Sequence, residues 1–153
     1  MSKQRDPTEE LLQVKEVDRQ IKYYENLIKI TQDRMNLASS WRENTKTSVT
    51  GKVNTREFTL VNGIARIQEA KKQIEAYQKF RECVFNKIHK IKDLSSIEIL
   101  VYRYIDNLEW SDVAKNMRFS IVHCRGYLHQ NALKEYSKIN YSCSFENMQN
   151  ELK

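Results

Sequence analysis

Long stretches of this chain contain no residue that would interrupt a helix. Only three Gly and one Pro occur among its 153 residues, and 30% of the residues are charged. Apolar residues recur at intervals of three, four and seven, which is the spacing of one helix face. The sequence therefore predicts an all-α protein. Its length corresponds to about one domain, or to a small domain with a long helical extension.

Residues 1–93 contain two periodic runs that predict a long antiparallel helical hairpin, coiled-coil-like in its spacing. The first run begins at Pro7 and ends at about 38–41, and the second begins at Asn54, which makes a capping-box-like start with Glu57. The polar segment between them, about 42–54, has Gly51 near its middle and is predicted to be a loop. The apolar positions of the two runs are Leu11, Val14, Ile21, Tyr24, Ile28 and Met35, then Leu60, Ile64, Ile67, Ile74, Tyr77, Val84, Ile88 and Ile91.

The chain is basic, which favours a polyanionic partner. Its formal net charge is +6 and its isoelectric point is about 9.2. Residues 51–93 hold ten Lys or Arg against five Asp or Glu, and thus carry +5 of that charge. These cations can follow a phosphate backbone, but the solvated face of a helical hairpin would have the same composition. The charge therefore supports nucleic-acid binding without establishing it.

The segment Trp110–Leu133, WSDVAKNMRFSIVHCRGYLHQNAL, places apolar and small residues where a helix-turn-helix needs them. Ala114 is expected where the two helices cross most closely, Phe119 would fill the turn, and Ser120 can cap the second helix. The second helix is expected to continue to about Ile139. The small shared core would consist of Val113, Met117, Cys124 and Tyr127, with Leu128 beside them on the inner face.

A short helix is predicted before this motif, capped by Ser95 or Ser96 and ended by Asn107. Residues 94–141 are therefore predicted to form a helix-turn-helix DNA-binding domain. The tail, 142–153, has weak periodicity and is expected to be either frayed or a short docking segment. The alternative for 94–141 is that short amphipathic helices simply complete a helical core.

Two residues depart from a tight helix-turn-helix. Arg118 stands in the turn, where Gly is common, so the turn should be wider than usual or mildly strained. Gly126 lies inside the second helix and should cost about 1 kcal/mol relative to Ala. That cost is offset if the missing side chain lets the backbone approach a neighbour or a phosphate.

The outward positions of the second helix are the candidate DNA contacts. Arg125 can bond to guanine with two hydrogen bonds, and Ile121 or Val122 can touch a thymine methyl. The histidines can donate to bases or phosphates, or they are ordinary surface residues. Trp110 is expected to pack in the core on Tyr102 or Leu108, while Arg103 and Arg118 are expected to contact phosphate or to be surface charges. The full set of candidate contacts is Arg118, Ser120, Ile121, Val122, His123, Arg125, Gly126, His129 and Lys134.

Motifs of catalysis and of metal or cofactor binding are not found. Three glycines cannot supply a phosphate loop or a dinucleotide fingerprint, and there is no nucleophile elbow. His123, Cys124 and His129 have the residue types of a zinc site, but neighbouring helical residues point about 100° apart. We therefore expect a protein that is not an enzyme and holds no metal or cofactor.

The cysteines and the first residues of the chain indicate the cellular compartment in which the protein is expected. Cys83, Cys124 and Cys143 are odd in number and have no short paired spacing, which argues against a disulfide framework and suits a reducing cytoplasm. The first residues lack the apolar core of a signal peptide, and no window reaches the length of a membrane span. The expected location is the cytoplasm.

The segment ILVYRYIDNLEWSDVAKNMRFS, followed by YLHQNALKEY, resembles the C-terminal part of the ArpU/RinA-like regulators of bacteriophages and prophages of Gram-positive bacteria. It is also similar to the fourth region of sigma factors. The specific match covers about the last third of the chain. Relative to the pattern, one extra residue separates Ser120 from Leu128–His129, which leaves the register of the second helix open. The matching residues are Leu100, Arg103, Tyr104 and Ile105, then Trp110, Val113, Ala114, Met117 and Ser120, and finally Leu128, His129, Ala132 and Leu133.

The resemblance implies a transcriptional regulator, an activator of phage late genes that binds double-stranded DNA and acts with host RNA polymerase. The helical hairpin would make it a homodimer and so set the spacing of two half-sites. One alternative is a phage DNA-packaging recognition subunit, which assembles into rings. The other is an adaptor that binds RNA polymerase and has no affinity for DNA.

Overall fold

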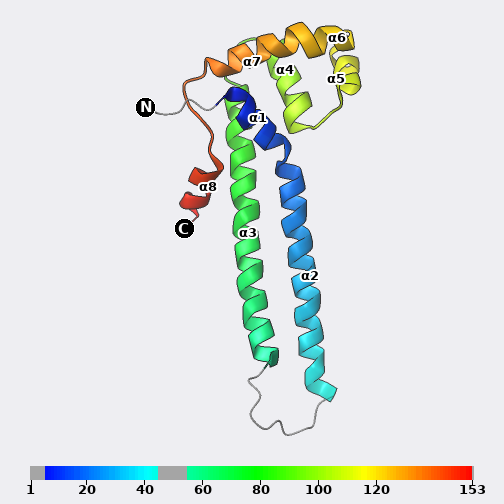
Figure 1. Ribbon diagram of the computed structural model, residues 1–153, viewed down its shortest axis with the longest axis vertical. Coiled ribbons are helices and arrows are strands. Elements are labelled where there is room, and N and C mark those ends of the chain that lie inside the picture. The colour runs from blue at the N-terminus through cyan, green and yellow to red at the C-terminus, as the bar shows by residue number, and fades with distance from the viewer. Residues whose placement is uncertain (1–5, 45–54, 153) are drawn as a thin grey trace. The chain divides into compact units, whose positions relative to one another are not determined.

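The computed structural model describes residues 6–44 and 55–152. All regular elements in these ranges are helical, so the predicted all-α class is confirmed (Figure 1). The helices η1 and η2 are π-helical turns. In chain order the elements are α1 (Pro7–Lys15), α2 (Val17–Asn44), α3 (Thr55–Ile88), α4 (Leu94–Leu100), η1 (Val101–Ile105), α5 (Trp110–Met117), α6 (Ile121–His123), η2 (Cys124–Leu128), α7 (His129–Ser137) and α8 (Phe145–Glu151).

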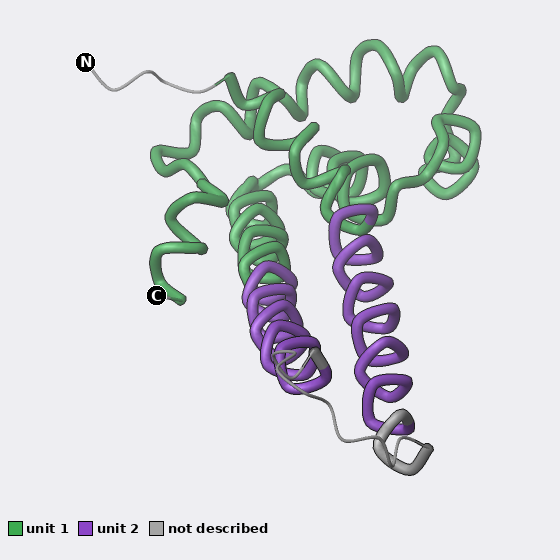
Figure 2. Tube along the Cα trace, turned by 60° about the horizontal axis from the view of Figure 1, so that its bottom comes forward, with its two compact units in different colours: residues 1–18, 76–153 green, residues 19–75 purple. Residues whose placement is uncertain are grey.

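The chain divides into two compact units, which Figure 2 distinguishes. Unit 1 combines residues 1–18 with 76–153, and unit 2 is 19–75. This division differs from the predicted one at residues 93 and 141, because α1 packs on η1 and α7 rather than only continuing into α2. Segments from both ends of the chain therefore share one core, which periodicity along the sequence cannot reveal.

Unit 2 consists of an antiparallel pair, most of α2 beside the first part of α3 (Figure 1). Small residues are buried in this pair: Thr31, Ala38, Gly63 and Ala70. A Cβ added to Gly63 would lie 2.5 Å from Sδ of Met35, so the close approach requires glycine unless Met35 moves. Large apolar side chains remain exposed on the outside, among them Ile64, which the sequence had placed on the inner stripe. The exposed set is Tyr23, Ile30, Leu37, Phe58, Val61 and Ile64.

The first predicted helix is in fact two helices, because the α-helix is interrupted at Glu16. Asp6 caps α1 by accepting a hydrogen bond from the backbone N–H of Thr8 at 3.0 Å. The helix α2 extends to Asn44. The rest of the predicted loop, 45–54, including the expected cap Asn54, lies outside the described residues.

A buried cluster of polar groups around Glu10 ties the two ends of unit 1 together. One carboxylate oxygen of Glu10, Oε2, accepts from Lys87 Nζ at 2.8 Å and from the Tyr136 hydroxyl at 2.7 Å. The other, Oε1, accepts from the backbone N–H of Cys143 at 2.8 Å. All four residues are buried, and the Lys87 ammonium also lies 4.3 Å from the centre of the Tyr136 ring. The carboxylate thus satisfies three donors that burial removes from water.

Cys83 and Cys143 form a disulfide whose Cα atoms are 6.0 Å apart, and Cys124 is a buried free thiol. The prediction of no disulfide framework is therefore wrong. The partners are 60 residues apart in sequence, so only the tertiary fold brings them together. The tail after Cys143 forms α8, and Phe145 stacks on Tyr77 with ring centres 4.1 Å apart. Of the two predicted alternatives for the tail, docking is the one observed.

Candidate nucleic-acid interface

The predicted DNA-binding segment folds as α4 with η1, then α5, then a helical run from Ile121 to Ser137. α4 contacts α7 and α5, and α5 contacts α6 and η2. Asp93 caps α4 by accepting from the Ser96 backbone N–H at 3.1 Å, so the expected cap at Ser95 or Ser96 is wrong by two or three residues. Four of the expected core residues, Val113, Ala114, Met117 and Cys124, are buried as predicted. Burial also raises the pKa of the Cys124 thiol.

The turn between α5 and the following helix is closed by Arg118 in the left-handed conformation, with φ of 60°. The backbone N–H groups of Arg118 and Phe119 both donate to the carbonyl of Ala114. A non-glycine residue in this conformation costs about 1–2 kcal/mol, so the turn is the mildly strained one that the sequence allowed. Ser120 then caps the next helix as predicted, accepting from the His123 backbone N–H at 3.1 Å.

A π-helical turn, η2, changes the register within the second helix. The backbone N–H of His129 donates to the carbonyl of Cys124, five residues earlier. A π-turn fits one more residue than an α-turn, so residues after it point in different directions from those that an α-period predicts. Tyr127, expected in the core, is 69% exposed, and that prediction is wrong. Leu128 is half-buried.

Most of the candidate contact residues lie at the surface. Among the residues that the structure describes, Val122 is the most exposed large apolar side chain, at 83%. Gly126 is half-buried, and a Cβ built on it would meet nothing within 4 Å, so the missing side chain serves no contact within the protein. The exposed members of the set are Arg118, Ser120, Ile121, Val122, His123, Arg125 and Lys134.

His129 is the exception, because its ring faces the interior. Its Nε2 lies 2.7 Å from the Tyr104 hydroxyl, and its ring meets that of Trp110 edge-on at 5.0 Å. Trp110 therefore packs on His129, a neighbour that the sequence did not suggest, and the Arg103 guanidinium covers its ring at 4.8 Å. Arg103 also donates to the carbonyl of Leu108 at 2.9 Å, which gives it a structural role.

The stability of this segment should fall in acid because of His129. Burial, and secondarily the charge of Arg103, lower the pKa of His129 below its usual value. As the pH falls below about 6.5, His129 therefore takes up a proton in the unfolded chain at a higher pH than in the folded chain. The free energy of unfolding decreases as a result. Urea unfolding at about pH 7.5 and about pH 5 should show a smaller loss in the His129→Gln variant than in the parent. Equal losses in both proteins would contradict this assignment.

The charged side chains between Asp112 and Glu135 are all positive. Between Asp112 and Glu135 the sequence has no carboxylate, although it contains Lys115, Arg118, Arg125 and Lys134. All four cations are exposed, and no ion pair is found for any of them among the described residues. A span of 22 residues with charge +4 and no internal compensation attracts polyanions.

Sequence reasoning missed two parts of this surface. It did not include Lys115, which any count of charge along α5 would have found. It also placed Tyr127 inside, although Tyr127 follows the outward His123 by four residues and so shares its helix face. Phe119, His123 and Tyr127 form a row of neighbouring rings on the outside.

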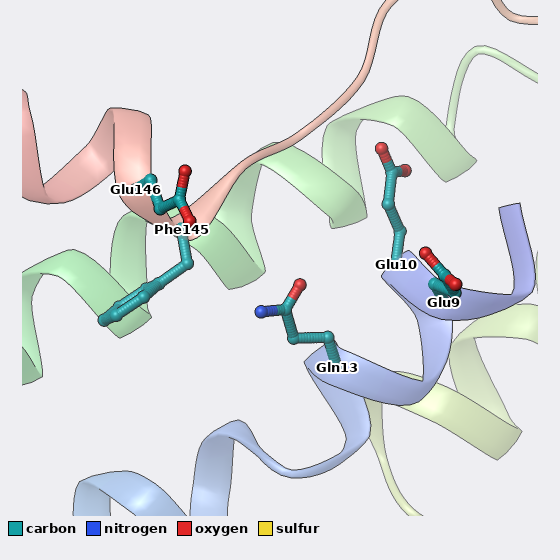
Figure 3. A pocket seen from close by; sticks show the side chains of 5 residues that line it. All are labelled: Glu9, Glu10, Gln13, Phe145 and Glu146. Atoms are coloured by element: carbon teal, nitrogen blue, oxygen red, sulfur yellow. The ribbon is translucent and has the colours of Figure 1, made fainter. Parts of the chain in front are cut away.

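A separate pocket of about 460 Å³ lies in unit 1 between α1 and α8 (Figure 3). Its walls include Glu9, Glu10 and Glu146, so it is acidic and unsuited to a nucleic acid. Glu10 is already engaged with Lys87, Tyr136 and Cys143. Among the described residues, no three His, Cys, Asp or Glu side chains are grouped as a metal site.

No protein-family model, no curated protein and no solved structure matches the chain. In the part of the chain that the structure describes, no helix has both the length and the apolar character that a membrane span requires.

Proposed function

We propose that this chain is a DNA-binding transcriptional regulator of the ArpU/RinA-like type, an activator of phage late genes in the cytoplasm of a bacterial host. In this proposal α5 and the helix from Ile121 form a helix-turn-helix, and the second helix enters the major groove of double-stranded DNA. The extra residue relative to the family pattern is accounted for by η2, since a π-turn contains one more residue than an α-turn.

The uncompensated positive charge between Asp112 and Glu135 is the observation that carries the proposal. Two of its cations, Arg118 and Arg125, lie at the turn and in the first part of the second helix, beside exposed Ile121 and Val122. Arginines supply salt-dependent attraction to phosphate and can read guanine, while short apolar side chains can contact thymine methyl groups. A purely structural helix would have no need of this combination on its outer face.

The proposed dimer would form through the helical hairpin of unit 2. Tyr23, Ile30 and Leu37 are seven residues apart on α2 and remain half exposed or more. A stripe with this spacing is typical of a helix that pairs with another helix. Pairing of two copies would place two second helices at a set separation along the duplex.

Selection from a pool of random duplex DNA, followed by sequencing, tests the proposal. We would select with the full chain at about 50 mM and at about 200 mM salt. Enrichment of one palindromic or directly repeated motif is expected. Retention without a motif and with a steep salt dependence would mean binding to phosphate alone, and the regulatory proposal would fail.

Two further measurements distinguish the proposed function from two alternatives. A DNA-packaging recognition subunit would assemble into rings, so sedimentation analysis would give a mass well above that of a dimer. An adaptor for RNA polymerase would show no retention of DNA at either salt concentration, and it would bind polymerase whether or not Arg125 is present.

Arg125→Ala should weaken binding to the selected site by about 1–3 kcal/mol and leave the melting temperature nearly unchanged. The reason is that Arg125 is exposed, so its removal costs the fold little, whereas two hydrogen bonds to guanine would be lost. Fluorescence anisotropy with the selected duplex measures the change. Arg66→Ala, at an exposed position of α3 in unit 2, is the matched control and should leave the affinity unchanged. A large loss of thermal stability in Arg125→Ala would instead assign that residue a structural role.

A further inference from the structure

Three rings follow one another along the outer side of the turn, α6 and η2. The rings of Phe119 and His123 have centres 5.2 Å apart, and those of His123 and Tyr127 are 5.7 Å apart and nearly parallel, at 19°. Phe119 is 48% exposed and Tyr127 is 69% exposed. These exposed rings sit at the two ends of the row, so each has a face that no neighbour in the row covers.

His123 and Tyr127 are four residues apart, so their rings are neighbours on one face of the helix. The sequence pattern placed Tyr127 in the core, but its side chain lies on the outside. Burying a large aromatic side chain stabilises a protein, so leaving this one in solvent forgoes a favourable contribution.

Duplex DNA cannot use the faces of these rings, because paired bases are stacked on each other and show only their edges in the grooves. Unpaired bases offer flat faces for stacking, and they are joined by phosphates that Arg118 and Arg125 can neutralise. The absence of carboxylates between Asp112 and Glu135 removes the repulsion that would oppose such a ligand. Ring faces and uncompensated cations on one helical segment therefore match the chemistry of a single strand.

We propose that this face binds single-stranded DNA, with Tyr127 and Phe119 stacking on unpaired bases and Arg118 and Arg125 contacting the flanking phosphates. The inference rests on the proposed function, because it assigns DNA binding to the same segment. The ligand here is the single strand that is released where a bound duplex opens. Single-strand binding and duplex binding depend on different side chains. Stacking on unpaired bases needs the ring of Tyr127, whereas recognition of base edges in the major groove does not.

Fluorescence anisotropy with the full chain tests the proposal. The probes are a labelled strand of about 16 nucleotides, the fully paired duplex of the same sequence, and a strand in which several bases are replaced by abasic sites. Tyr127→Ala should weaken binding to the single strand about 5- to 150-fold, which is the range that stacking of one base on one ring provides. Tyr127→Phe keeps the ring and should stay within about twofold of the parent. The abasic strand, which has the same charge, should bind to the parent at least as weakly as the intact strand binds to Tyr127→Ala.

Phe85→Ala is the matched control, because Phe85 is also an exposed aromatic residue whose ring lies against a histidine ring, that of His89, but it belongs neither to the DNA-binding segment nor to the proposed dimer stripe. It should leave binding to both probes unchanged. Duplex binding without single-strand binding would overturn this inference and leave the proposed function standing. Equal losses on duplex and single strand in Tyr127→Ala, or a Tyr127→Phe variant as weak as Tyr127→Ala, would also overturn it. Binding to neither probe would overturn both the inference and the proposed function.

Discussion

Replacement of Glu10 by Ala is expected to lower the free energy of unfolding of unit 1 by about 3–5 kcal/mol. The Lys87 side chain is only 6% exposed, so the variant leaves a buried ammonium without its carboxylate. The Tyr136 hydroxyl and the backbone N–H of Cys143 lose their acceptor at the same time. Burial, reinforced by its bond to Glu10, holds the pKa of Tyr136 far above the usual range, so this hydroxyl remains a donor at any physiological pH. Urea unfolding followed by near-ultraviolet circular dichroism measures the loss.

Two further variants keep this test informative if Glu10→Ala fails to fold. Glu10→Gln retains a side-chain oxygen of similar size and should be destabilised less than Glu10→Ala. Combining Glu10→Leu with Lys87→Met should recover part of the stability, because it removes the stranded charge and replaces the pair by apolar groups. Glu9→Ala, at the exposed neighbouring position, is the control and should change the free energy by less than about 0.5 kcal/mol. If Glu9→Ala and Glu10→Ala were equally stable, the buried cluster would have no energetic role.

Reduction of the Cys83–Cys143 disulfide is expected to lower the free energy of unfolding by about 2–4 kcal/mol. The bond closes a loop between residues that are 60 apart, and opening it returns conformational freedom mainly to the unfolded chain. The comparison is urea unfolding of the oxidised protein with and without dithiothreitol. Cys143→Ser should be as unstable as the reduced parent and should not respond to the reductant.

Thiol titration in denaturant establishes the starting state for that comparison. The oxidised chain should release one reactive thiol, that of Cys124, and the reduced chain three. Three thiols in protein purified without reductant from an oxidising environment would contradict the pairing. In a reducing cytoplasm the pair would be a dithiol, and the tail would then depend on the Phe145–Tyr77 contact and on the bond from Cys143 to Glu10.

Local patterns in the sequence predicted several features that depend on near neighbours. The lack of helix breakers predicted the all-α class, Ser120 was correctly predicted as a cap, and the three- and four-residue spacing identified Val113, Ala114, Met117 and Cys124 as buried. Arg118 was recognised as unusual in its turn and does adopt a left-handed conformation there. At these positions the cap and the buried helix face depend on residues within one or two turns of chain, so the sequence pattern was informative.

The tertiary structure alone decided the features that depend on distant segments. The pairing of Cys83 with Cys143, the buried Glu10 carboxylate and the position of His129 between Tyr104 and Trp110 each join residues separated by many turns of helix. The π-turn η2 contacts α4 and α5, and Tyr127 within it lies on the surface instead of in the predicted core. The sequence by itself therefore determined that the chain is helical and that Ser120 caps the helix after the turn. The packing of distant segments decided which helix faces meet, and therefore which side chains remain exposed to a partner. The periodicity of apolar residues along the sequence does not contain this information.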